Sequence, residues 1–394
     1  MANNIPQGYK QTELGIVPED WDVKILGNIG TFSKGSGVSR TESNTGKIPC
    51  VRYGELYTHH NDYIKTFNSF ISSEVAKNAK MIKCGDVLFA ASGETKEDIG
   101  KSVAFVGDFE AFAGGDIIIL STNGMLCDAK YIGYASNSLH VVKQKAAKAQ
   151  GDAVVHITSD SIKNIKILLP PLSEQKAIAE ALSDVDELIT ALDKKIAKKR
   201  LIKQGAMHRL IGFSVTNKLQ SILLKNIVNI RKGSMLTSDN FVSGNIPVIA
   251  GGKAPAGFHN IANRPAKTIT ISASGASAGY VAFYDEPIFA TDCSTIEPNS
   301  KYNIEYIYYL LKYYQNDIYT MQTGGAQPHI HPSDLNELRI LYKDNLKEQQ
   351  AIATILSDMD KEIADLEAQR DKYRLVKSGM MQKLLTGQIR LKKE

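Results

Sequence analysis

One set of side chains occurs in the order of a hydrolase triad. Ser277 lies in a G-x-S-x-G pattern at residues 275–279, and Asp292 and His329 follow it along the chain. The nucleophile of such a triad sits between a strand and a helix. Residues 280–284, Tyr-Val-Ala-Phe-Tyr, instead predict a strand directly after the pattern. We therefore interpret this stretch as a Gly- and Ser-rich hairpin whose small side chains let a ligand approach the backbone.

A second set has the spacing of a metal-dependent nuclease. In such an enzyme Asp86 and Glu94 would hold Mg²⁺, and Lys96 would assist the attacking water. The alternative interpretation is a loop whose Lys96 and Lys101 face solvent or phosphate. Residues 93–102 also resemble a phosphate-binding loop, but they place six residues between glycines where that motif has four. A nuclease remains the alternative enzymatic hypothesis.

The histidines and cysteines do not predict a metal site. His59, His60, His329 and His331 have no carboxylate or cysteine at a ligating spacing, and the four cysteines form no C-x-x-C pair. Reduced thiols are typical of a cytoplasmic protein. No apolar run approaches 18 residues, so we expect no membrane association. The sequence predicts no catalytic residue, metal or cofactor on this chain.

Polar and basic residues beside glycines could bind a polyanion, such as a nucleic acid, instead. Lys and Arg would contact phosphates, and polar side chains would reach base edges. The net charge of +5 is compatible with a polyanionic partner. In the first part of the chain the candidates are Lys34, Ser36, Arg40, Lys47, Arg52, Ser92, Thr95, Lys96 and Lys101. In the second part they are Arg231, Lys232, Ser234, Lys253, His259, Ser274, Ser277 and Gln327. The alternative for each residue is an ordinary solvated side chain.

These candidates lie on either side of a long repeated segment. Residues 174–211 and 348–385 superpose without a gap at a shift of 174, and 18 of the 38 positions are identical. A repeat of this length fixes the architecture of the chain before local patterns do. Each copy predicts one long helix of about 57 Å at 1.5 Å per residue. We expect Ser173 to cap the first helix.

Apolar residues in both copies alternate at intervals of four and three. The predicted seam contains Ile178, Leu182, Val185, Ile189, Leu192 and Ile196 in the first copy and Ile352, Leu356, Met359, Ile363, Leu366 and Tyr373 in the second. A narrow stripe of this kind suits a partner helix. We therefore expect the two copies to pack as an antiparallel coiled coil. The alternative is that each stripe packs on the core of its own domain.

The remaining parts of the chain are strand-rich. Residues 86–90, 103–106 and 117–120 predict strands and residues 129–145 a helix; residues 268–272, 280–284 and 288–291 predict strands and residues 305–314 the matching helix. The predicted fold is α+β, with two mixed, strand-rich domains separated by the two long helices.

Short landmarks recur in the same order in both strand-rich parts. The pairs are residues 26–35 with 224–233, Ser92 with Ser274, Val103 with Val281, Asp116 with Asp292, and His156 with His329. The repeat therefore extends beyond the helices. We predict an internal pseudo-twofold repeat that brings the two ends of the chain close together. The predicted segments are a domain at 1–172 that includes an arm at 1–23, a helix at 173–211, a domain at 212–345, and a helix with a tail at 346–394.

A basic cluster marks the end of the first helix. It consists of Lys194, Lys195, Lys198, Lys199, Arg200 and Lys203. The cluster could line DNA, face solvent on a coiled coil, or bind an acidic partner. The sequence does not choose among these three interpretations.

The chain resembles the specificity subunits of Type I restriction–modification systems. The resemblance rests on Pro170-Pro171-Leu-Ser-Glu-Gln175 at the start of the first helix and on residues 8–21, 203–210 and 377–384. It implies two target recognition domains, each reading one half of a bipartite, asymmetric DNA site. It further implies that the helices set the spacing between half-sites and dock two copies of a methyltransferase subunit.

The same resemblance places the chemistry on other subunits. S-adenosylmethionine would bind the adenine-specific methyltransferase, and ATP and Mg²⁺ would serve a restriction and translocase subunit. This chain would then be non-catalytic and would bind double-stranded DNA. A structural coiled-coil adaptor unrelated to DNA remains a further alternative, although an adaptor has no need of two divergent globular domains.

Overall fold

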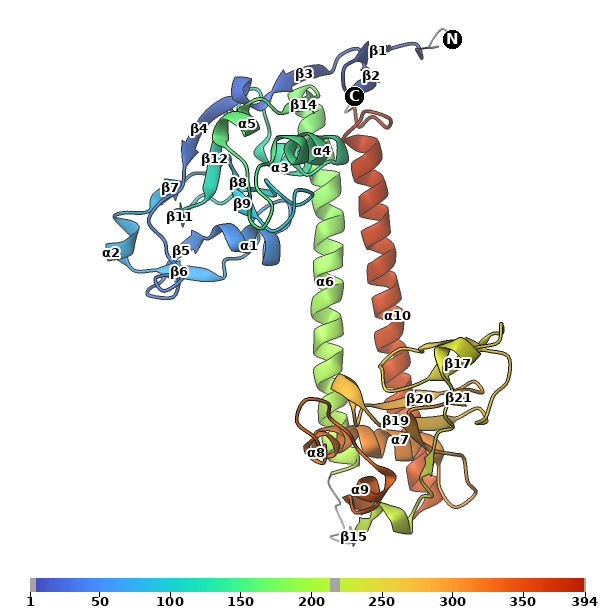
Figure 1. The fold of residues 1–394 in the computed structure, drawn as a ribbon. Helices are drawn as coiled ribbons and strands as arrows, with labels where there is room; N and C mark the ends of the chain where they lie inside the picture. The colour runs from blue at the N-terminus through green and yellow to red at the C-terminus, as the bar shows by residue number, and fades with distance from the viewer. Residues whose placement is uncertain (1–4, 213–219, 393–394) are drawn as a thin grey trace. The chain divides into compact units, whose positions relative to one another are not determined.

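The computed structural model describes residues 5–212 and 220–392, which fall into two compact units (Figure 1). Unit 1 comprises Met1–Ala191 and Arg370–Glu394, and unit 2 comprises Leu192–Gln369. The division falls within the two long helices, so each unit holds one strand-rich domain and a part of each helix. The four-segment division made from the sequence stays a prediction.

Two four-stranded sheets form the framework of unit 1. The antiparallel sheet has the order β4 (Gly30–Lys34), β12 (Ile117–Thr122), β8 (Asp86–Ala90) and β10 (Ser102–Ala104). The second sheet has the order β6 (Ser69–Ile71), β5 (Ile48–Val51), β11 (Ala111–Ala113) and β7 (Lys80–Ile82), with β5 and β11 parallel. Strand β8 is buried along its whole length, because Val87 and Phe89 face one hydrophobic core while Leu88 and Ala90 face another.

Short elements complete unit 1. Strand β1 (Tyr9–Thr12) pairs with β2 (Gly15–Pro18), β3 (Asp22–Ile25) with β14 (Lys166–Leu169), and β9 (Ser92–Gly93) with β13 (Val155–His156). The helices of the domain are η1 (Leu26–Asn28), α1 (Tyr53–Thr58), α2 (Ser73–Ala76), α3 (Ala129–Ser136), α4 (Leu139–Lys148) and α5 (Ser159–Lys163).

Unit 2 repeats this plan with fewer strands. Its antiparallel sheet has the order β16 (Arg231–Lys232), β22 (Cys293–Ile296), β19 (Thr268–Ser272) and β20 (Val281–Tyr284). Its second sheet has the order β18 (Gly257–His259), β17 (Ile246–Ile249) and β21 (Phe289–Ala290), with β17 and β21 parallel. The remaining elements are β15 (Gln220–Leu223) paired with β23 (Arg339–Tyr342), η2 (Leu224–Asn226), η3 (Ser238–Asn240), η4 (Gly275–Ser277), α7 (Ile304–Tyr313), α8 (Gln315–Thr320) and α9 (Pro332–Asn336).

The predicted strands and the second predicted helix are confirmed within a few residues. The predicted helix at 129–145 is wrong as a single element, because it breaks into α3 and α4 at Asn137 and Ser138. Ser138 has an extended backbone with φ −68° and ψ 152°. The Asn137 side chain leaves the helix to accept the Ser102 N–H at 3.1 Å and to donate to Asp62 at 2.9 Å. Tertiary hydrogen bonds thus override the local helical preference.

Corresponding backbone hydrogen bonds show that the two domains are true structural repeats. Gly35 N–H donates to Ile117 O, and Gly233 N–H donates to Cys293 O, each at 2.8 Å. Glycine is needed at both positions, since a Cβ would lie 2.0 Å from a carbonyl oxygen of the neighbouring turn.

Further matched bonds tie the turns together. Those of unit 1 are Ser36 N–H to Ala113 O, Ala91 N–H to Asp116 O, and Ile157 N–H to Ala91 O; those of unit 2 are Ser234 N–H to Ala290 O, Ala273 N–H to Asp292 O, and Ile330 N–H to Ala273 O. The proposed landmark pairs at Ser92, Asp116 and His156 therefore match the structural repeat.

One landmark pair is off by a residue. Strand pairing places Ser102 opposite Phe89 and Val281 opposite Ile271, so Val281 corresponds to Ser102 and not to Val103. A slip of one residue sends side chains to the opposite face of a sheet. Accordingly Val281 belongs to the core beside the long helices, whereas Val103 belongs to the core between the two sheets.

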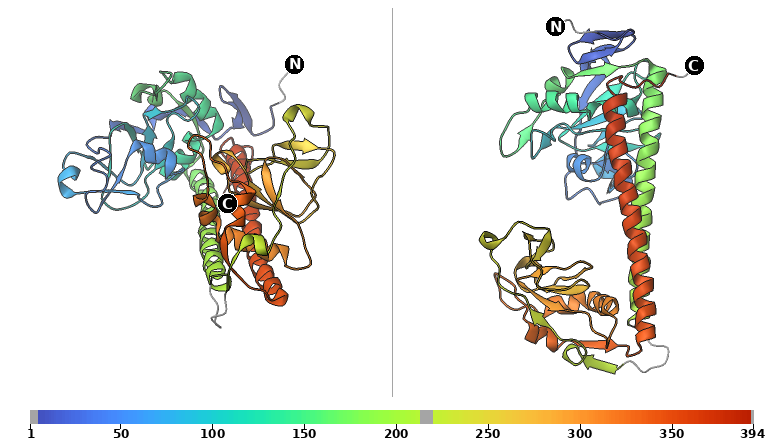
Figure 2. Two further views of the ribbon diagram at one scale, coloured as in Figure 1. Left: turned by 60° about the horizontal axis from the view of Figure 1, so that its bottom comes forward. Right: turned by 90° about the vertical axis from the view of Figure 1, so that its right-hand side faces the viewer.

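The two predicted long helices are confirmed as α6 (Leu172–Leu210) and α10 (Leu346–Leu384), which lie side by side (Figure 2). The expected cap at Ser173 is wrong, because α6 already includes that residue. The Pro171 carbonyl instead accepts the N–H groups of Glu174 and Gln175. At the start of α10 the Asn345 side chain accepts the Lys347 N–H at 2.9 Å. Among the helices in the described ranges, none is long and apolar enough to cross a membrane.

The seam residues divide between two packing environments. Ile178 and Leu182 join the core of the domain in unit 1, together with Leu384 and Leu385 of the opposite helix end. Ile352 and Leu356 join the corresponding core in unit 2. The coiled-coil interpretation and the domain-core alternative therefore each describe part of the stripe.

The rest of the seam packs mainly between helices. In unit 2 Ile196, Ile363 and Leu366 form a small cluster with Leu192. Val185, at 9% exposure, is buried, while Ile189, Met359 and Tyr373 are half-buried.

The beginning and the end of the described chain meet within unit 1. The Tyr9 hydroxyl donates to Gly387 O at 3.1 Å, and Arg390 donates to Asp20 at 2.7 Å. Arg390 also binds both oxygens of Glu174 at 2.7 Å, and the Trp21 indole donates to the same carboxylate. The predicted proximity of the chain ends is thereby confirmed.

Candidate nucleic-acid interface

Both units gather polar side chains at one matched edge of the framework. We call this the polar edge and define it as Ser92, Asp116 and His156 in unit 1, and Ser274, Asp292 and His329 in unit 2. Ser92 Oγ lies 2.9 Å from His156 Nδ1. In unit 2 the Ser274 hydroxyl instead donates to Asp292, and the backbone of Ser274 bridges that of His329. The two edges thus have the same frame and different side-chain networks.

The predicted DNA-binding residues of unit 1 lie in loops and strand ends. Lys34 ends β4, and Ser36, Arg40 and Lys47 are exposed in the segment that leads to β5. Arg40 and Arg52 line a hollow of about 650 Å³ together with Tyr53 and Asp116. Arg52 is held by Glu55 at 3.5 Å. This hollow joins two of the predicted arginines to the polar edge.

Other candidates of unit 1 lie apart from that hollow. Thr95 donates to Asp98 at 2.9 Å within a short loop, and Lys96 is 4.0 Å from Asp152. Lys101 lines a different hollow, described below. The structure therefore brings together only part of the predicted set.

In unit 2 the basic candidates surround the polar edge more loosely. Arg231 pairs with Glu297 at 2.6 Å, whereas Lys232 and Ser234 are exposed at positions that match Lys34 and Ser36. Lys253 lies 5.5 Å from the centre of the Tyr280 ring. Gln327 is exposed in the loop before His329, and Ser277 is half-buried in η4.

Two candidates point inward. Ser92 is buried where β9 pairs with β13, and His259 is buried where its Nδ1 accepts the Val242 N–H at 3.0 Å. Both side chains have hydrogen-bond partners inside their own domain. Sequence pattern alone cannot show this, because burial depends on strands that are distant in the chain.

The nuclease alternative is not supported. Asp86 begins β8 and its carboxylate accepts the Lys83 N–H at 2.8 Å, while Glu94 and Lys96 lie beyond the other end of that strand. A five-residue strand spans about 16 Å, which is too far for one metal ion. Across residues 5–212 and 220–392, no group of three or more His, Cys, Asp or Glu side chains could hold a metal.

The triad-like order in unit 2 does not form a hydrolase site. Residues 275–277 form the short helix η4, which leads into strand β20 as expected for a hairpin. The hydroxyl that meets Asp292 belongs to Ser274 and not to Ser277. A triad requires a histidine between the serine and the carboxylate.

The histidines also lack a ligating arrangement. Burial, followed by the neighbouring His59, lowers the pKa of His60 to about 4. The rings of His329 and His331 are stacked with centres 6.4 Å apart.

A repeated glutamine attaches each domain to its long helix. Gln175 accepts the Asp128 N–H at 2.9 Å and donates to Leu126 O and Pro170 O. Gln349 accepts the Asn303 N–H at 2.8 Å and donates to Tyr342 and Lys343 O. Asp128 and Asn303 are the N-caps of α3 and α7. Sequence reasoning noted the first Glu-Gln pair and missed this role.

Each unit has one clamp, a set of one tyrosine, one aspartate and one lysine that joins the two long helices. In unit 1 Tyr134 donates to Asp186 at 2.7 Å, and Lys377 pairs with Asp186 at 2.8 Å. In unit 2 Tyr309 donates to Asp360 at 2.8 Å, and Lys203 pairs with the same carboxylate. The signal was available in the sequence, since both aspartates and both lysines are identical at the repeat shift of 174.

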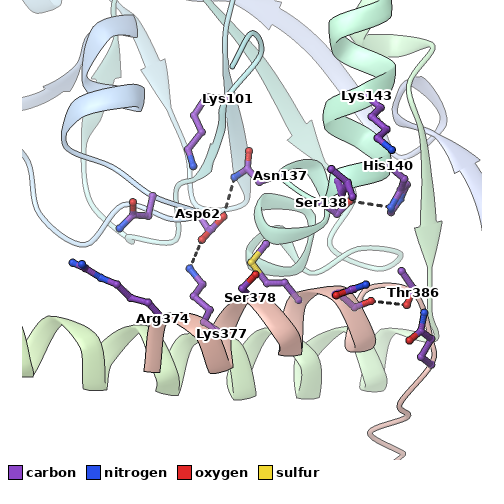
Figure 3. A pocket seen from close by; sticks show the side chains of 15 residues that line it. Asp62, Lys101, Asn137, Ser138, His140, Lys143, Arg374, Lys377, Ser378 and Thr386 are labelled. Atoms are coloured by element: carbon purple, nitrogen blue, oxygen red, sulfur yellow. Dashed lines mark hydrogen bonds and ion pairs between the residues drawn. The ribbon is translucent and has the colours of Figure 1, made fainter. Parts of the chain in front are cut away.

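The clamp of unit 1 borders a hollow of about 770 Å³ between the domain and α10 (Figure 3). Lys377 bridges Asp186 to Asp62, and Asn137 donates to Asp62. Burial opposes the charge on Lys377, but the two carboxylates outweigh it and raise its pKa above the ordinary value. Lys101 and Lys143 add positive charge to the lining.

Half of the basic cluster on α6 is engaged by α10. Lys199 pairs with Glu362 at 2.7 Å, Arg200 with Glu367, and Lys203 with Asp360. Lys194, Lys195 and Lys198 are exposed. Lys199, Arg200 and Lys203 thus contribute to the packing of the two helices. The three interpretations of the basic cluster, namely contact with DNA, solvent or an acidic partner, apply to the exposed Lys194, Lys195 and Lys198.

Known proteins are similar to this chain in sequence. Residues 18–200 and 217–372 match the model of the Type I restriction modification DNA specificity domain. The MjaVIII specificity subunit of Methanocaldococcus jannaschii is 25% identical, over 98% of this chain and 97% of its own. A putative type I specificity subunit of Mycoplasma pneumoniae is 23% identical, over 93% and 96%.

Solved structures show the same fold. The S subunit of a Type I restriction–modification system from M. genitalium has a TM-score of 0.69 at 19% identity, covering 98% of this chain and 97% of that one. A structure concerned with complex assembly and conformational transition of the type I R-M system has a TM-score of 0.56 at 16% identity, covering 95% and 99%. The family match covers most of the chain in two copies, each including one strand-rich domain. The chain therefore belongs to the Type I restriction–modification DNA specificity family.

Proposed function

We propose that this chain is the DNA-reading subunit of a Type I restriction–modification complex and that each strand-rich domain reads one half of a bipartite, asymmetric site. The observation that carries this proposal is the polar edge, which has one backbone frame in both units and different side chains on it. A shared frame lets both domains approach DNA in the same way. Different side chains present different hydrogen-bonding groups to base edges.

The phosphate contacts are assigned to the exposed basic residues around that edge. Lys34 and Lys232 occupy matched strand ends, and Arg40 and Arg52 line the hollow beside Asp116. Ser36, Lys47 and Lys96 in unit 1, and Arg231, Ser234, Lys253, Ser277 and Gln327 in unit 2, complete the proposed contact surface. Ser92 and His259 support it from inside.

The partners follow from the family. Double-stranded DNA is the ligand, and two copies of a methyltransferase subunit bind the chain, with a restriction and translocase subunit joining the complex. S-adenosylmethionine and ATP with Mg²⁺ bind those subunits and not this one. Such a complex works in the cytoplasm. The solved relative concerned with complex assembly supports the expectation of a multi-subunit enzyme.

A domain exchange tests the assignment of half-sites. Residues 24–168 are replaced by the corresponding domain of a relative, and the methylated adenines are mapped by sequencing in the reconstituted complex. One half of the methylated motif should change while the other stays the same. A change in both halves would show that the two domains do not read independently.

The length of the helices tests the proposed spacing role. Four helix-forming residues inserted after Lys195 add about 6 Å at 1.5 Å per residue. Because the duplex advances about 3.4 Å per base pair along each strand, the unread gap should grow by roughly one to two base pairs. Two inserted residues rotate the seam by about half a turn and should abolish activity. An active four-residue variant with an unchanged gap would contradict the spacing role.

A further inference from the structure

The hollow of about 770 Å³ in unit 1 has a basic lining that the proposed contact surface does not include. Its cationic side chains are Lys101, Lys143, Arg374 and Lys377 (Figure 3). Among the described residues that line it, Asp62 is the one carboxylate, and it is already bound to Lys377 at 2.6 Å. Lys377 also pairs with Asp186 at 2.8 Å. The positive charges of Lys101 and Lys143 are therefore not balanced within the lining.

Lys101 is half-buried and has no counter-charge. In the part of the chain that the structure describes, its ammonium has neither a hydrogen bond nor a carboxylate partner. Its neighbour Lys145 is buried and donates to Gly100 O at 2.7 Å. Burial, followed by the charge of Lys101, lowers the pKa of Lys145 to about 7. Two neighbouring cations that are partly withdrawn from water cost free energy, and an anion in the hollow would reduce this cost.

A tyrosine with two lysines occupies the corresponding place in unit 2. Tyr280 precedes β20 as Lys101 precedes β10, because strand pairing aligns these two strands. The ammonium groups of Lys253 and Lys312 lie 5.5 Å and 4.8 Å from the centre of the Tyr280 ring. Unit 2 therefore has positive charge where unit 1 has it, although the charge is carried by other residues.

Lys312 has the position that Asn137 has in unit 1. Each lies nine residues after the N-cap of its helix, which is Asn303 for α7 and Asp128 for α3. Burial, followed by the charge of Lys203 in the clamp, lowers the pKa of Lys312. The lysines of unit 2 are thus close enough to repel one another, as Lys101 and Lys145 do in unit 1.

We call this place the basic site of each unit. It consists of Lys101, Lys143, Arg374 and Lys377 in unit 1, and of Lys203, Lys253 and Lys312 in unit 2. Uncharged side chains could fill the same space without repulsion. Positive charge that is kept at a matched place, while the residues that carry it change, indicates an anionic ligand.

The basic site lies beside the polar edge in each unit. The strand order β12, β8, β10 places Lys101 two strand spacings from Asp116, and the order β22, β19, β20 does the same for Tyr280 and Asp292. At about 4.8 Å per spacing this separation is roughly 10 Å. The major groove of DNA is about 12 Å wide. A duplex whose base edges face the polar edge therefore has a phosphate backbone within reach of the basic site.

We propose that the basic site of each unit binds a backbone phosphate of the DNA, next to the bases that are read at the polar edge. This inference rests on the proposed function. A backbone phosphate is bound through its charge, which fits two sites that share cations but not the side chains between them. A free nucleotide would also need a matched pocket for its base.

Fluorescence anisotropy of the chain assembled with its methyltransferase subunit, with DNA at several salt concentrations, tests this proposal. The variants Lys101→Met, Lys143→Met and Lys312→Met keep an apolar stem and remove one charge each. The control is Lys148→Met, an exposed lysine of α4 outside the lining of the hollow. Each variant should weaken binding roughly fivefold on every sequence and reduce the slope of log affinity against log salt by about 0.9. The control should change neither quantity.

The melting temperature of the isolated chain separates binding from folding. Lys101→Met and Lys312→Met should leave it unchanged or higher, because each removes a half-buried cation that a neighbouring cation repels. Partial unfolding of a variant would lower the fraction of active complex and would not change the salt slope. A lower melting temperature with an unchanged slope would make these lysines structural and overturn the proposal.

Two further outcomes would also overturn it. If the three variants bind DNA with the wild-type salt slope and sequence preference, the basic site is wrong and the proposed function stands. A wild-type complex that shows no sequence-selective binding would remove the proposed function as well. Isothermal titration calorimetry with pyrophosphate covers the other source of phosphate. Binding of pyrophosphate that the variants lose, together with an unchanged salt slope on DNA, would assign the basic site to a free phosphorylated ligand.

Discussion

Unit 1 packs Lys145 against Gly100, whereas unit 2 packs Ile318 against Gly279. The two glycines occupy the same place before β10 and β20 and have positive φ angles of 68° and 81°. The backbone at these glycines therefore repeats, even though the side chain packed against it is a lysine in unit 1 and an isoleucine in unit 2. The two domains share the backbone hydrogen bonds that build each of them, whereas the side chains around those bonds differ.

The polar edge shows the same difference at the surface. Unit 1 joins Ser92 to His156, and unit 2 joins Ser274 to Asp292. Asp116 has a left-handed backbone at φ 58° after two glycines, while the corresponding turn of unit 2 is one residue shorter. Divergence thus also affects the surface that is proposed to contact DNA. The Tyr-Asp-Lys clamps and the Gln attachments, which hold domain to helix, are repeated.

The largest expected effect tests whether the two cores are equivalent. Leu182 and Leu356 are fully buried in matched cores. Truncation of a buried leucine costs about 2–5 kcal/mol, and a buried carboxylate costs more. Leu182→Asp and Leu356→Asp should each unfold their own unit or prevent assembly, as measured by urea denaturation. Lys198→Asp, an exposed change, serves as the control. Wild-type stability in Leu182→Asp would refute the seam assignment.

Replacement of Gln175 should destabilise the protein more than replacement of Gln349. Gln175→Leu leaves one buried N–H and two backbone carbonyls without their partner, at a cost of about 3 kcal/mol. Gln349→Leu should cost less, because one of its three partners is the Tyr342 hydroxyl, which can rotate. Differential scanning calorimetry measures both against Lys176→Leu, an exposed neighbour. A larger loss of stability for Gln349→Leu than for Gln175→Leu would contradict this explanation.

Much of this architecture follows from the sequence because its signals are local or periodic. The 4-3 spacing of Ile178 and Leu182 and the buried run Asp86–Ala90 each predict their element without tertiary knowledge. The missed features depend on distant contacts. The break at Asn137 arises from hydrogen bonds to Ser102 and Asp62, and the buried His259 ring accepts the N–H of Val242, 17 residues away. The position of Val281 was misjudged because a slip of one residue is invisible in a three-residue match.

The site itself was less accessible to sequence reasoning. Glycine-flanked basic residues correctly identified exposed strand ends, as at Lys34 and Lys232. The same rule also selected Ser92, whose neighbour His156 lies 64 residues away in the chain. Only the strand pairing shows that these two residues meet.

The buried lysine offers a test with a pH dependence. Burial, with a smaller effect of Lys101, lowers the pKa of Lys145 from 10.5 to about 7, although its ammonium donates to Gly100 O at 2.7 Å. Below pH 7 the lysine is charged in both folded and unfolded chains, and the folded state bears the full cost. Stability should therefore rise between pH 7 and 10.5 as the folded form loses its proton first.

Lys145→Ile gives unit 1 the same type of side chain that Ile318 places against Gly279 in unit 2. It should stabilise unit 1 by roughly 2 kcal/mol at pH 7, where it removes a buried cation, and by less as the pH approaches 10.5. Urea denaturation across this pH range measures the difference, and Ile318→Lys should give unit 2 the opposite slope. A gain for Lys145→Ile that does not change with pH would show that folding does not lower the pKa of Lys145.

The smallest expected effect concerns the matched phosphate contacts. Lys34 and Lys232 end the corresponding strands β4 and β16, opposite Ile118 and Ser294. If both contact phosphate, Lys34→Ala and Lys232→Ala should each weaken DNA binding by about 1 kcal/mol and reduce the slope of log affinity against log salt by about 0.9. The methylated motif should stay the same, because phosphate contacts carry no sequence information. Fluorescence anisotropy of the assembled complex at several salt concentrations measures both quantities, with Lys163→Ala, whose ammonium pairs with Asp160 on α5, as the control. A reduced slope for one variant and an unchanged slope for the other would show that the two domains do not present the same strand end to DNA.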